Sequence, residues 1–324
     1  EFAIVLTAAD ADEVRAVARA IVNALSFAPF GMATGSPKGH STSSSSASIT
    51  AFPMGFSLVL IFMDWNMLAP DKSTWSGLDN LVKLVNDGLV WTSLYNTAYF
   101  TFFSVPGRII VALLAALLLN QAVFGLSFFR TAFYLPTVLP AVASAILWMW
   151  MFNPAMGLFN MGLTAVGLPR SEWLWNPATS KPSLILMTLW TTGNVIIILL
   201  AGLQAIPNHL YEAATMDGAT GWARFRNVTL PMLSPSLLYT LIMGIIGSFQ
   251  VFTSAFLMTG PPPGGPMNST LFTVLYVYRV AFEQFNMGYA SAVAWVLFVV
   301  ILVFTIVQWK LADKWVYYEG GEGK

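Results

Sequence analysis

Five long apolar stretches, each close to the length of a membrane-spanning helix, limit what this 324-residue chain can fold into. A bilayer has a hydrocarbon core of about 30 Å, and a helix needs roughly 20 apolar residues to cross it. Strands of a membrane barrel would instead alternate in polarity over about ten residues. The sequence therefore predicts an all-α transmembrane protein. The five stretches are 94–119, 131–152, 183–203, 235–258 and 287–309.

A sixth apolar stretch, 51–63, is too short to cross a bilayer without help from the residues before it. Those residues are of a different kind, because 35–50 are rich in Ser and Gly, which is typical of a flexible segment. We predict an atypical, flexible N-terminal segment over 1–50. We predict one transmembrane domain over 51–319, with its core at about 91–309.

Composition argues against several classes of function. Charged residues make up 9% of the chain, against about 25% in soluble domains, and the mean hydropathy is +0.68. Basic and acidic residues number 15 each, so no net positive charge would attract nucleic acid. The chain has no Cys, and its two His residues lie far apart, so we expect no metal site. It contains no Walker motif, so we expect it not to hydrolyse ATP itself.

The distribution of basic residues indicates which side of the membrane is cytoplasmic. One set of loops is mainly basic, whereas the other set mixes basic with acidic residues, and the positive-inside rule favours the first set as cytoplasmic. Arg108 lies inside a stretch, where a charge is costly, and we expect it to snorkel or to pair. The basic set is Arg130, Arg224, Arg226, Lys310, Lys314 and Lys324.

The segment 205–235, on the predicted cytoplasmic side, is much longer than a simple connection between two helices. Asn208 is predicted to cap a first short helix over 209–216, and Gly218 is predicted to break it, because Gly readily adopts positive φ. Thr220 is predicted to cap a second helix over 221–228. Leu230 and Pro231 are predicted to end that helix and to turn the chain toward the membrane.

This ordered, partly apolar surface predicts that 205–235 docks onto another protein. The alternative is an amphipathic loop that rests on lipid headgroups.

The same segment carries a motif. Glu212-Ala213-Ala214 is followed after three residues by Gly218, and after nine more by Val228-x-Leu230-Pro231. This pattern resembles the EAA motif of ABC importer permeases, with Val in place of the usual Ile. Over roughly 52–319 the chain resembles the sugar-type (MalF/UgpA-like) family, with further similarity at 129–136, 203–207 and 288–292. The resemblance implies a six-helix type I ABC importer permease whose first helix is incomplete or atypical.

The resemblance also implies a function and a set of partners. The chain would be a transport subunit, not an enzyme, that moves a sugar or oligosaccharide across the bacterial cytoplasmic (inner) membrane. It would assemble with a second permease subunit as a heterodimer, two ATP-binding subunits, an extracytoplasmic solute-binding protein and membrane lipid. ATP would be used by the partner subunits, with no cofactor bound by this chain. The implied ATPase-coupling residues are Glu212, Ala213, Ala214, Asp217, Gly218, Phe225, Val228, Leu230 and Pro231.

The resemblance places the solute path between the stretches 183–203 and 235–258, near the middle of the membrane. Aromatic faces and neutral hydrogen-bonding groups suit a sugar, and the candidates on these stretches are Trp190, Asn194, Ser248 and Gln250. Structural hydrogen bonding between helices is the alternative role for such polar groups.

Three other readings remain open. The same fold could import glycerol-3-phosphate or another small polar solute, although a phosphate would favour cationic groups on the path, and only Arg108 lies in a predicted span. A stand-alone secondary transporter would need acidic or His residues within its spans, and the five long stretches contain none. A membrane enzyme is the weakest alternative, because the sequence shows no acid–base constellation.

Overall fold

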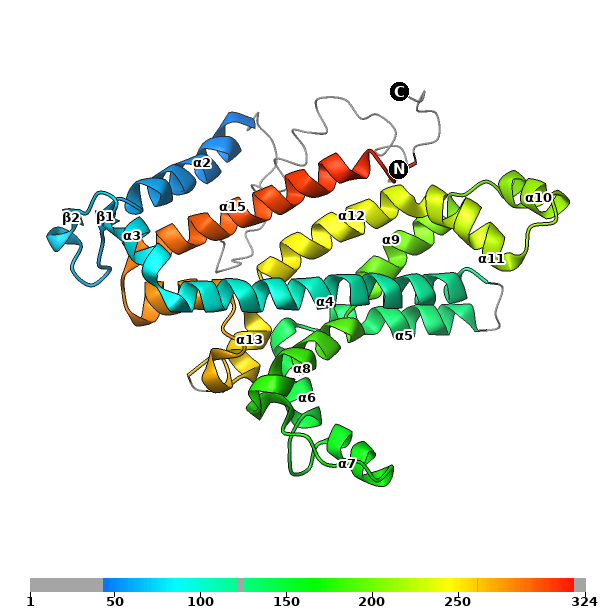
Figure 1. The fold of residues 1–324 in the computed structure, drawn as a ribbon, viewed down its shortest axis with the longest axis horizontal. Helices are drawn as coiled ribbons and strands as arrows, with labels where there is room; N and C mark the ends of the chain where they lie inside the picture. The colour runs from blue at the N-terminus through cyan, green and yellow to red at the C-terminus, as the bar shows by residue number, and fades with distance from the viewer. Residues whose placement is uncertain (1–42, 122–124, 261, 318–324) are drawn as a thin grey trace. The chain divides into compact units, whose positions relative to one another are not determined.

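The computed structural model describes residues 43–121, 125–260 and 262–317, so 1–42 of the predicted flexible segment lie outside the described residues. The chain forms two compact units, both built mainly of helices (Figure 1). Unit 1 comprises Glu1–Asp87 and Val277–Phe298, and unit 2 comprises Gly88–Tyr276 and Val299–Lys324.

Unit 1 contains the first described helix, and its start corrects a prediction. Helix α2 begins at Ser43, so the last eight residues of the segment predicted to be flexible are helical. Ser has an intermediate helix propensity, and a helix formed by the apolar residues after it can extend backwards cooperatively. The other elements of unit 1 are β1 (Met63–Asp64), η1 (Pro70–Lys72), β2 (Thr74–Trp75), α3 (Asp79–Asn86), π-helical η5 (Arg279–Glu283) and the first part of α15 (Met287–Ala312).

Two polar contacts organise unit 1. The indole Nε1 of Trp295 in α15 donates to Ser57 Oγ in α2 at 3.2 Å. The Asn80 amide in α3 donates to the carbonyl oxygens of Ile61 and Met63 at 2.8 and 3.0 Å. The two Asn80 bonds satisfy carbonyl groups at and just before the start of β1, which pairs with β2.

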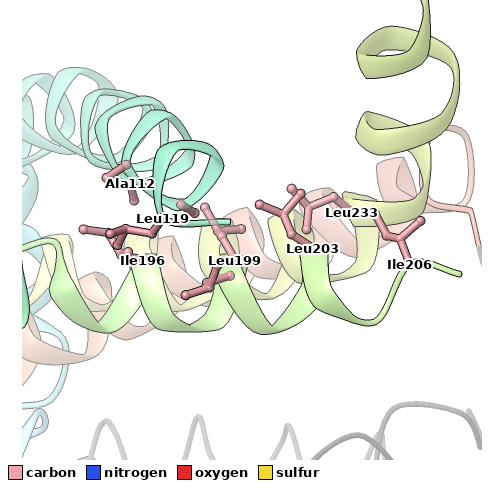
Figure 2. Packing of buried hydrophobic residues seen from close by; sticks show 10 residues of the cluster. Ala112, Leu119, Ile196, Leu199, Leu203, Ile206 and Leu233 are labelled. Carbon is pink, nitrogen blue, oxygen red and sulfur yellow. The ribbon is translucent and has the colours of Figure 1, made fainter. Parts of the chain in front are cut away.

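Unit 2 holds most of the apolar chain. Its core lies where α4, α9 and α12 pack on one another, and the buried residues of this cluster are all Ala, Leu or Ile (Figure 2). Leu199 and Leu233 are completely buried in this cluster. The elements of unit 2 are α4 (Gly88–Leu119), α5 (Leu126–Val138), α6 (Ala141–Met151), α7 (Leu158–Ala165), η2 (Trp173–Trp175), α8 (Pro177–Trp190), α9 (Gly193–Gln204), α10 (Asn208–Met216), α11 (Gly221–Arg224), π-helical η3 (Phe225–Thr229), α12 (Leu230–Phe249), α13 (Thr253–Met258), η4 (Pro266–Asn268), most of α14 (Thr273–Tyr278) and the rest of α15.

The described residues contain three single helices that are long and apolar enough to cross a membrane: Gly88–Leu119, Gly221–Phe249 and Met287–Ala312. Two bent pairs, α5 with α6 and α8 with α9, raise the number of spans to as many as five. The five predicted stretches are therefore all helical, but the predicted stretches 131–152 and 183–203 are not single helices.

Helix interruptions correct three of the predicted spans. The break between α5 and α6 bends the chain by 100° at Pro140, which lacks an N–H and forces Leu139 into extended backbone. The break between α8 and α9 bends the chain by 49° around Thr191. The predicted stretch 235–258 is also divided, because α12 ends at Phe249 and α13 starts at Thr253.

Candidate coupling loop and membrane cavity

The first helix of the loop, α10, matches its predicted position to within one residue. It runs from Asn208 to Met216, and Pro207 is the residue before its first turn, with extended backbone at φ −64° and ψ 135°. The prediction that Asn208 caps this helix is wrong, because Asn208 is already helical and no side chain caps the first turn. The restricted backbone of Pro207 sets the helix start instead.

Gly218 ends α10 in the left-handed conformation that its predicted role requires, with φ at +74°. The Gly218 N–H donates to the Thr215 carbonyl at 3.0 Å, and the Ala219 N–H donates to the Ala214 carbonyl at 2.9 Å. This is the Schellman pattern of a glycine-terminated helix. Among the described residues, no atom outside its immediate chain neighbours lies within 4 Å of the Cβ position at Gly218, so the positive φ and not a close contact favours glycine here.

The second half of the loop differs from its prediction. Thr220 caps α11 as predicted, since its Oγ1 accepts from the Ala223 N–H at 3.3 Å. The chain then passes through η3 into α12 without a turn, and Thr229 keeps helical angles of −63° and −51°. The prediction that Leu230 and Pro231 end the helix is therefore wrong. Pro231 is accommodated because the π-helical turn before it changes the hydrogen-bond spacing where the proline offers no N–H.

One side of the loop packs against the core of unit 2, to which the loop belongs. The Tyr211 hydroxyl lies 3.0 Å from Thr229 Oγ1, which joins α10 to η3. Leu210 and Tyr211 pack against the buried cluster of α4, α9 and α12. The loop is thus held against the helices that form the core.

The other side of the loop is exposed. Glu212, Ala213 and Asp217 are exposed, and within the described residues the Glu212 carboxylate makes no hydrogen bond or ion pair. Leu230 is partly exposed, while Ala214, Phe225, Val228 and Pro231 are half-buried. Two large apolar side chains of the loop, Met216 at 89% and Trp222 at 70%, are exposed but were not predicted as part of its surface. An aromatic residue in a polar loop is a signal that could have found Trp222.

A cavity of about 420 Å³ lies where the interrupted helices of unit 2 come together. Its walls come from the break between α5 and α6, the break between α8 and α9, and the segment between α12 and α13. Non-helical backbone is tolerated at membrane depth where it lines such a cavity. None of the described residues that line it is charged. Its polar lining residues are Thr137, Ser144, Thr188, Thr191, Asn194, Gln250, Thr253 and Ser254.

The four residues proposed for the solute path separate into two groups. Asn194 and Gln250 line the cavity together. Ser248 is 6% exposed and donates to Thr101 Oγ1 on α4 at 2.9 Å, which is the structural role considered as its alternative. The Trp190 ring makes an edge-to-face contact with the Trp148 ring, with 5.8 Å between the ring centres, and it does not line the cavity.

Arg108 pairs with the backbone next to the cavity. Its Nη2 donates to the Thr191 carbonyl at 3.4 Å, and Thr191 is the residue that ends α8. A cation at a helix C-terminus interacts favourably with the unpaired carbonyl groups there. Arg108 therefore supports the bend between α8 and α9 and does not itself line the cavity. Among the described residues, no cluster of His, Asp and Glu could hold a metal ion.

Comparison with known proteins places this architecture in a family. The family model "Binding-protein-dependent transport system inner membrane component" matches residues 108–316. The chain is 39% identical to "Probable ABC transporter permease protein YesP" of Bacillus subtilis (strain 168), over 84% of this chain and 88% of that protein. It is 36% identical to "Trehalose/maltose transport system permease protein MalF" of Thermococcus litoralis, over 75% and 81%. It is 38% identical to "Lactose transport system permease protein LacF" of Rhizobium radiobacter, over 74% and 82%.

Solved structures support the same conclusion. A chain of a bacterial alginate ABC transporter, solved with an alginate pentasaccharide-bound periplasmic protein, has a TM-score of 0.66 at 26% identity, covering 74% of this chain and 83% of that one. A second alginate importer structure has a TM-score of 0.71 at 24% identity and supports the fold, covering 82% and 91%. This chain has the type I importer permease fold. It belongs to the binding-protein-dependent inner membrane component family, the multi-pass permeases of ABC transporters.

Proposed function

We propose that this chain is the permease subunit of an ABC importer that carries a sugar or oligosaccharide across the bacterial cytoplasmic membrane. The observation that carries the proposal is the exposed helix–Gly–helix loop with its unpaired Glu212 and its left-handed Gly218. The names of two relatives include trehalose/maltose and lactose transport, which supports the solute class. The neutral amide and hydroxyl lining of the cavity suits the hydroxyl groups of a sugar.

In this proposal the loop faces the cytoplasm and docks onto a separate ATP-binding subunit. Glu212 would accept charge-assisted hydrogen bonds from that subunit, and the small side chain of Ala213 would let the two surfaces approach. Two such subunits would hydrolyse the ATP, so this chain would need no nucleotide site and no cofactor. A second permease subunit and an extracytoplasmic solute-binding protein would complete the complex, and the alginate transporter structure with its periplasmic protein is consistent with the latter.

The continuous helix Gly221–Phe249 gives a physical route from the docking loop to the solute cavity. Its 29 residues span about 43 Å at 1.5 Å per residue. Its first turns lie in the exposed loop, and the residue that ends it, Gln250, lines the cavity. A displacement of the loop by an ATPase would therefore move one wall of the cavity directly, which is the motion that alternating access requires.

Two alternative functions fit less well. A phosphorylated solute would favour a cation in the cavity, whereas Arg108 is used at the end of α8. A stand-alone secondary transporter would favour acidic or His side chains in its spans, and α4, α5, α6, α8, α9, α12 and α15 contain none.

The docking role is tested by reversing the charge of Glu212. We expect Glu212→Lys to lower ATP-driven uptake in proteoliposomes by more than about ten-fold, because a charge-assisted bond is replaced by repulsion. The ATPase should also be lost from pull-downs of the tagged chain. Glu172→Lys is the control, since it makes the same change at an exposed acid far from the loop. Wild-type uptake and ATPase recovery with Glu212→Lys would contradict the proposal.

The polar side chains that line the cavity are expected to contribute to solute affinity. Asn194→Ala and Gln250→Ala are expected to raise the KM for uptake several-fold, because each removes neutral hydrogen-bonding groups from the cavity wall. Ser248→Ala is the control: it removes the bond to Thr101 and should cost about 1 kcal/mol of stability without changing KM. A KM that rises only with Ser248→Ala would assign the solute path to Ser248 and Trp190 and not to the cavity.

A further inference from the structure

A second concave surface of unit 2 has a chemistry different from that of the solute cavity. An open groove of about 320 Å³ lies between α4, the end of α12 and the second half of α15. Its surface is almost entirely apolar. The lining residues used here are Trp91, Tyr95, Ala98, Phe249, Val300 and Phe304.

Lys181 lies beside this groove and has no acidic partner in the part of the chain that the structure describes. It falls in the first turns of α8, although the sequence placed it before the predicted span. Its Nζ donates to Asn96 Oδ1 at 2.9 Å and lies 4.9 Å from the centre of the Tyr99 ring. An ammonium group has three N–H donors, and Lys181 uses one of them within the described residues, with no carboxylate in ion-pair range.

The Asn96 side chain that accepts the bond from Lys181 is itself held by backbone carbonyl groups. The Asn96 amide donates to the carbonyl oxygens of Asn268 at 2.8 Å and Leu271 at 3.1 Å, so its Oδ1 must face Lys181. Asn96 is itself 2% exposed. The ammonium group of Lys181 is therefore held in place by the buried Asn96 side chain and still has donors available for an anion.

Tyr95 connects the charge to the groove. Its ring lies 5.1 Å from Lys181 Nζ and also forms part of the groove wall, and 64% of the residue is exposed. Tyr95 is seven residues after the start of α4, which is about 10 Å along the helix. Trp and Tyr are enriched where a membrane changes from headgroups to acyl chains, and an exposed Tyr95 near the start of a long apolar helix suits that position.

We propose that Lys181 and this groove form a binding site for an anionic phospholipid. The phosphate accepts hydrogen bonds from the Lys181 ammonium group, and an acyl chain lies in the groove past Ala98 toward Phe304. A cation held at one end of an apolar groove is complementary to a lipid with an anionic head. A helix from a second permease subunit would match the apolar groove alone and would leave the Lys181 charge without a partner.

Native mass spectrometry of the purified full-length chain in detergent tests the site, with phosphatidylglycerol and phosphatidylcholine added separately at equal concentration. We expect the wild type to bind phosphatidylglycerol about five-fold more tightly, which is the effect of one basic residue on an anionic lipid. Lys181→Gln should abolish this preference, Lys181→Arg should retain it, and Ala98→Trp should reduce binding of both lipids by filling the groove.

Lys310→Gln is the matched control, because it removes a basic residue from the last turn of α15, away from the groove, and should leave the preference intact. The proposal is overturned if the wild type binds the two lipids equally, or if Lys181→Gln keeps the preference. It is also overturned if Ala98→Trp leaves the binding of both lipids unchanged.

Discussion

Replacing Gly218 with Val is expected to abolish most solute uptake while leaving the membrane helices folded. At φ +74° a β-branched residue is strained by about 1–3 kcal/mol, enough to shift the loop out of its native conformation in most molecules. The bonds from the N–H groups of Gly218 and Ala219 to the end of α10 would then be lost. Because the strain is local to an exposed loop, thermal unfolding of the chain should change little. We expect uptake to fall about ten-fold or more.

Two controls separate backbone strain from a general effect of substitution in the loop. Gly218→Asn should retain most of the uptake, because Asn tolerates the left-handed conformation better than any β-branched residue. Gly221→Ala changes another exposed glycine of the same loop, also with no atom within 4 Å of its Cβ position, and should behave as wild type. Uptake and ATPase activity would be measured in proteoliposomes with the copurified ATPase. Normal uptake by Gly218→Val would show that the bend is not required.

Much of the loop 205–235 could be predicted from sequence because local rules decide it. A glycine after a short amphipathic helix and a threonine before the next one are signals that operate within a few residues. Gly218 and Thr220 therefore appear in their predicted roles. The prediction that the helix ends at Pro231 was wrong because the π-helical turn before it lets the helix continue, and such a turn is not recognisable from residue type.

The interruptions that build the cavity could not be predicted, because proline alone does not break a membrane helix. Pro106 lies inside α4 and Pro136 inside α5, and both helices continue past them. Pro140 instead coincides with a 100° bend. Neighbouring helices decide whether the freed carbonyl groups are satisfied, and that information is not local.

The same limit applied to the solute path. Ser248 and Gln250 are two residues apart in sequence, yet one bonds to α4 and the other lines the cavity. The difference depends on which helix lies opposite each side chain, and residue type does not encode it.

A side chain at Gly202 is expected to destabilise the chain strongly, because the contact between α9 and α12 leaves no room for one. A Cβ atom at Gly202 would lie 2.6 Å from Ser236 Oγ and 2.8 Å from a methyl carbon of Leu233. Leu233 is completely buried in the core and cannot move aside without disturbing α4 as well. We expect Gly202→Val to destabilise the chain by about 3 kcal/mol or more, since overpacking is added to the loss of close helix contact.

Thermal unfolding of the purified chain in detergent, followed by Trp fluorescence, measures this effect as a fall in Tm of several degrees. Gly247→Val is the matched control, because Gly247 also lies in a membrane helix but has no atom within 4 Å of its Cβ position. Equal Tm values for the two variants would show that the close packing at Gly202 does not stabilise the chain.

The close contact at Gly202 also fixes α9, which carries Asn194, against α12, which ends beside Gln250. Gly202→Ala should push these helices apart by less than Gly202→Val does, and should therefore raise the KM for the solute even where the chain stays folded. Ser236→Ala should partly restore both KM and Tm in that variant by removing the nearest atom.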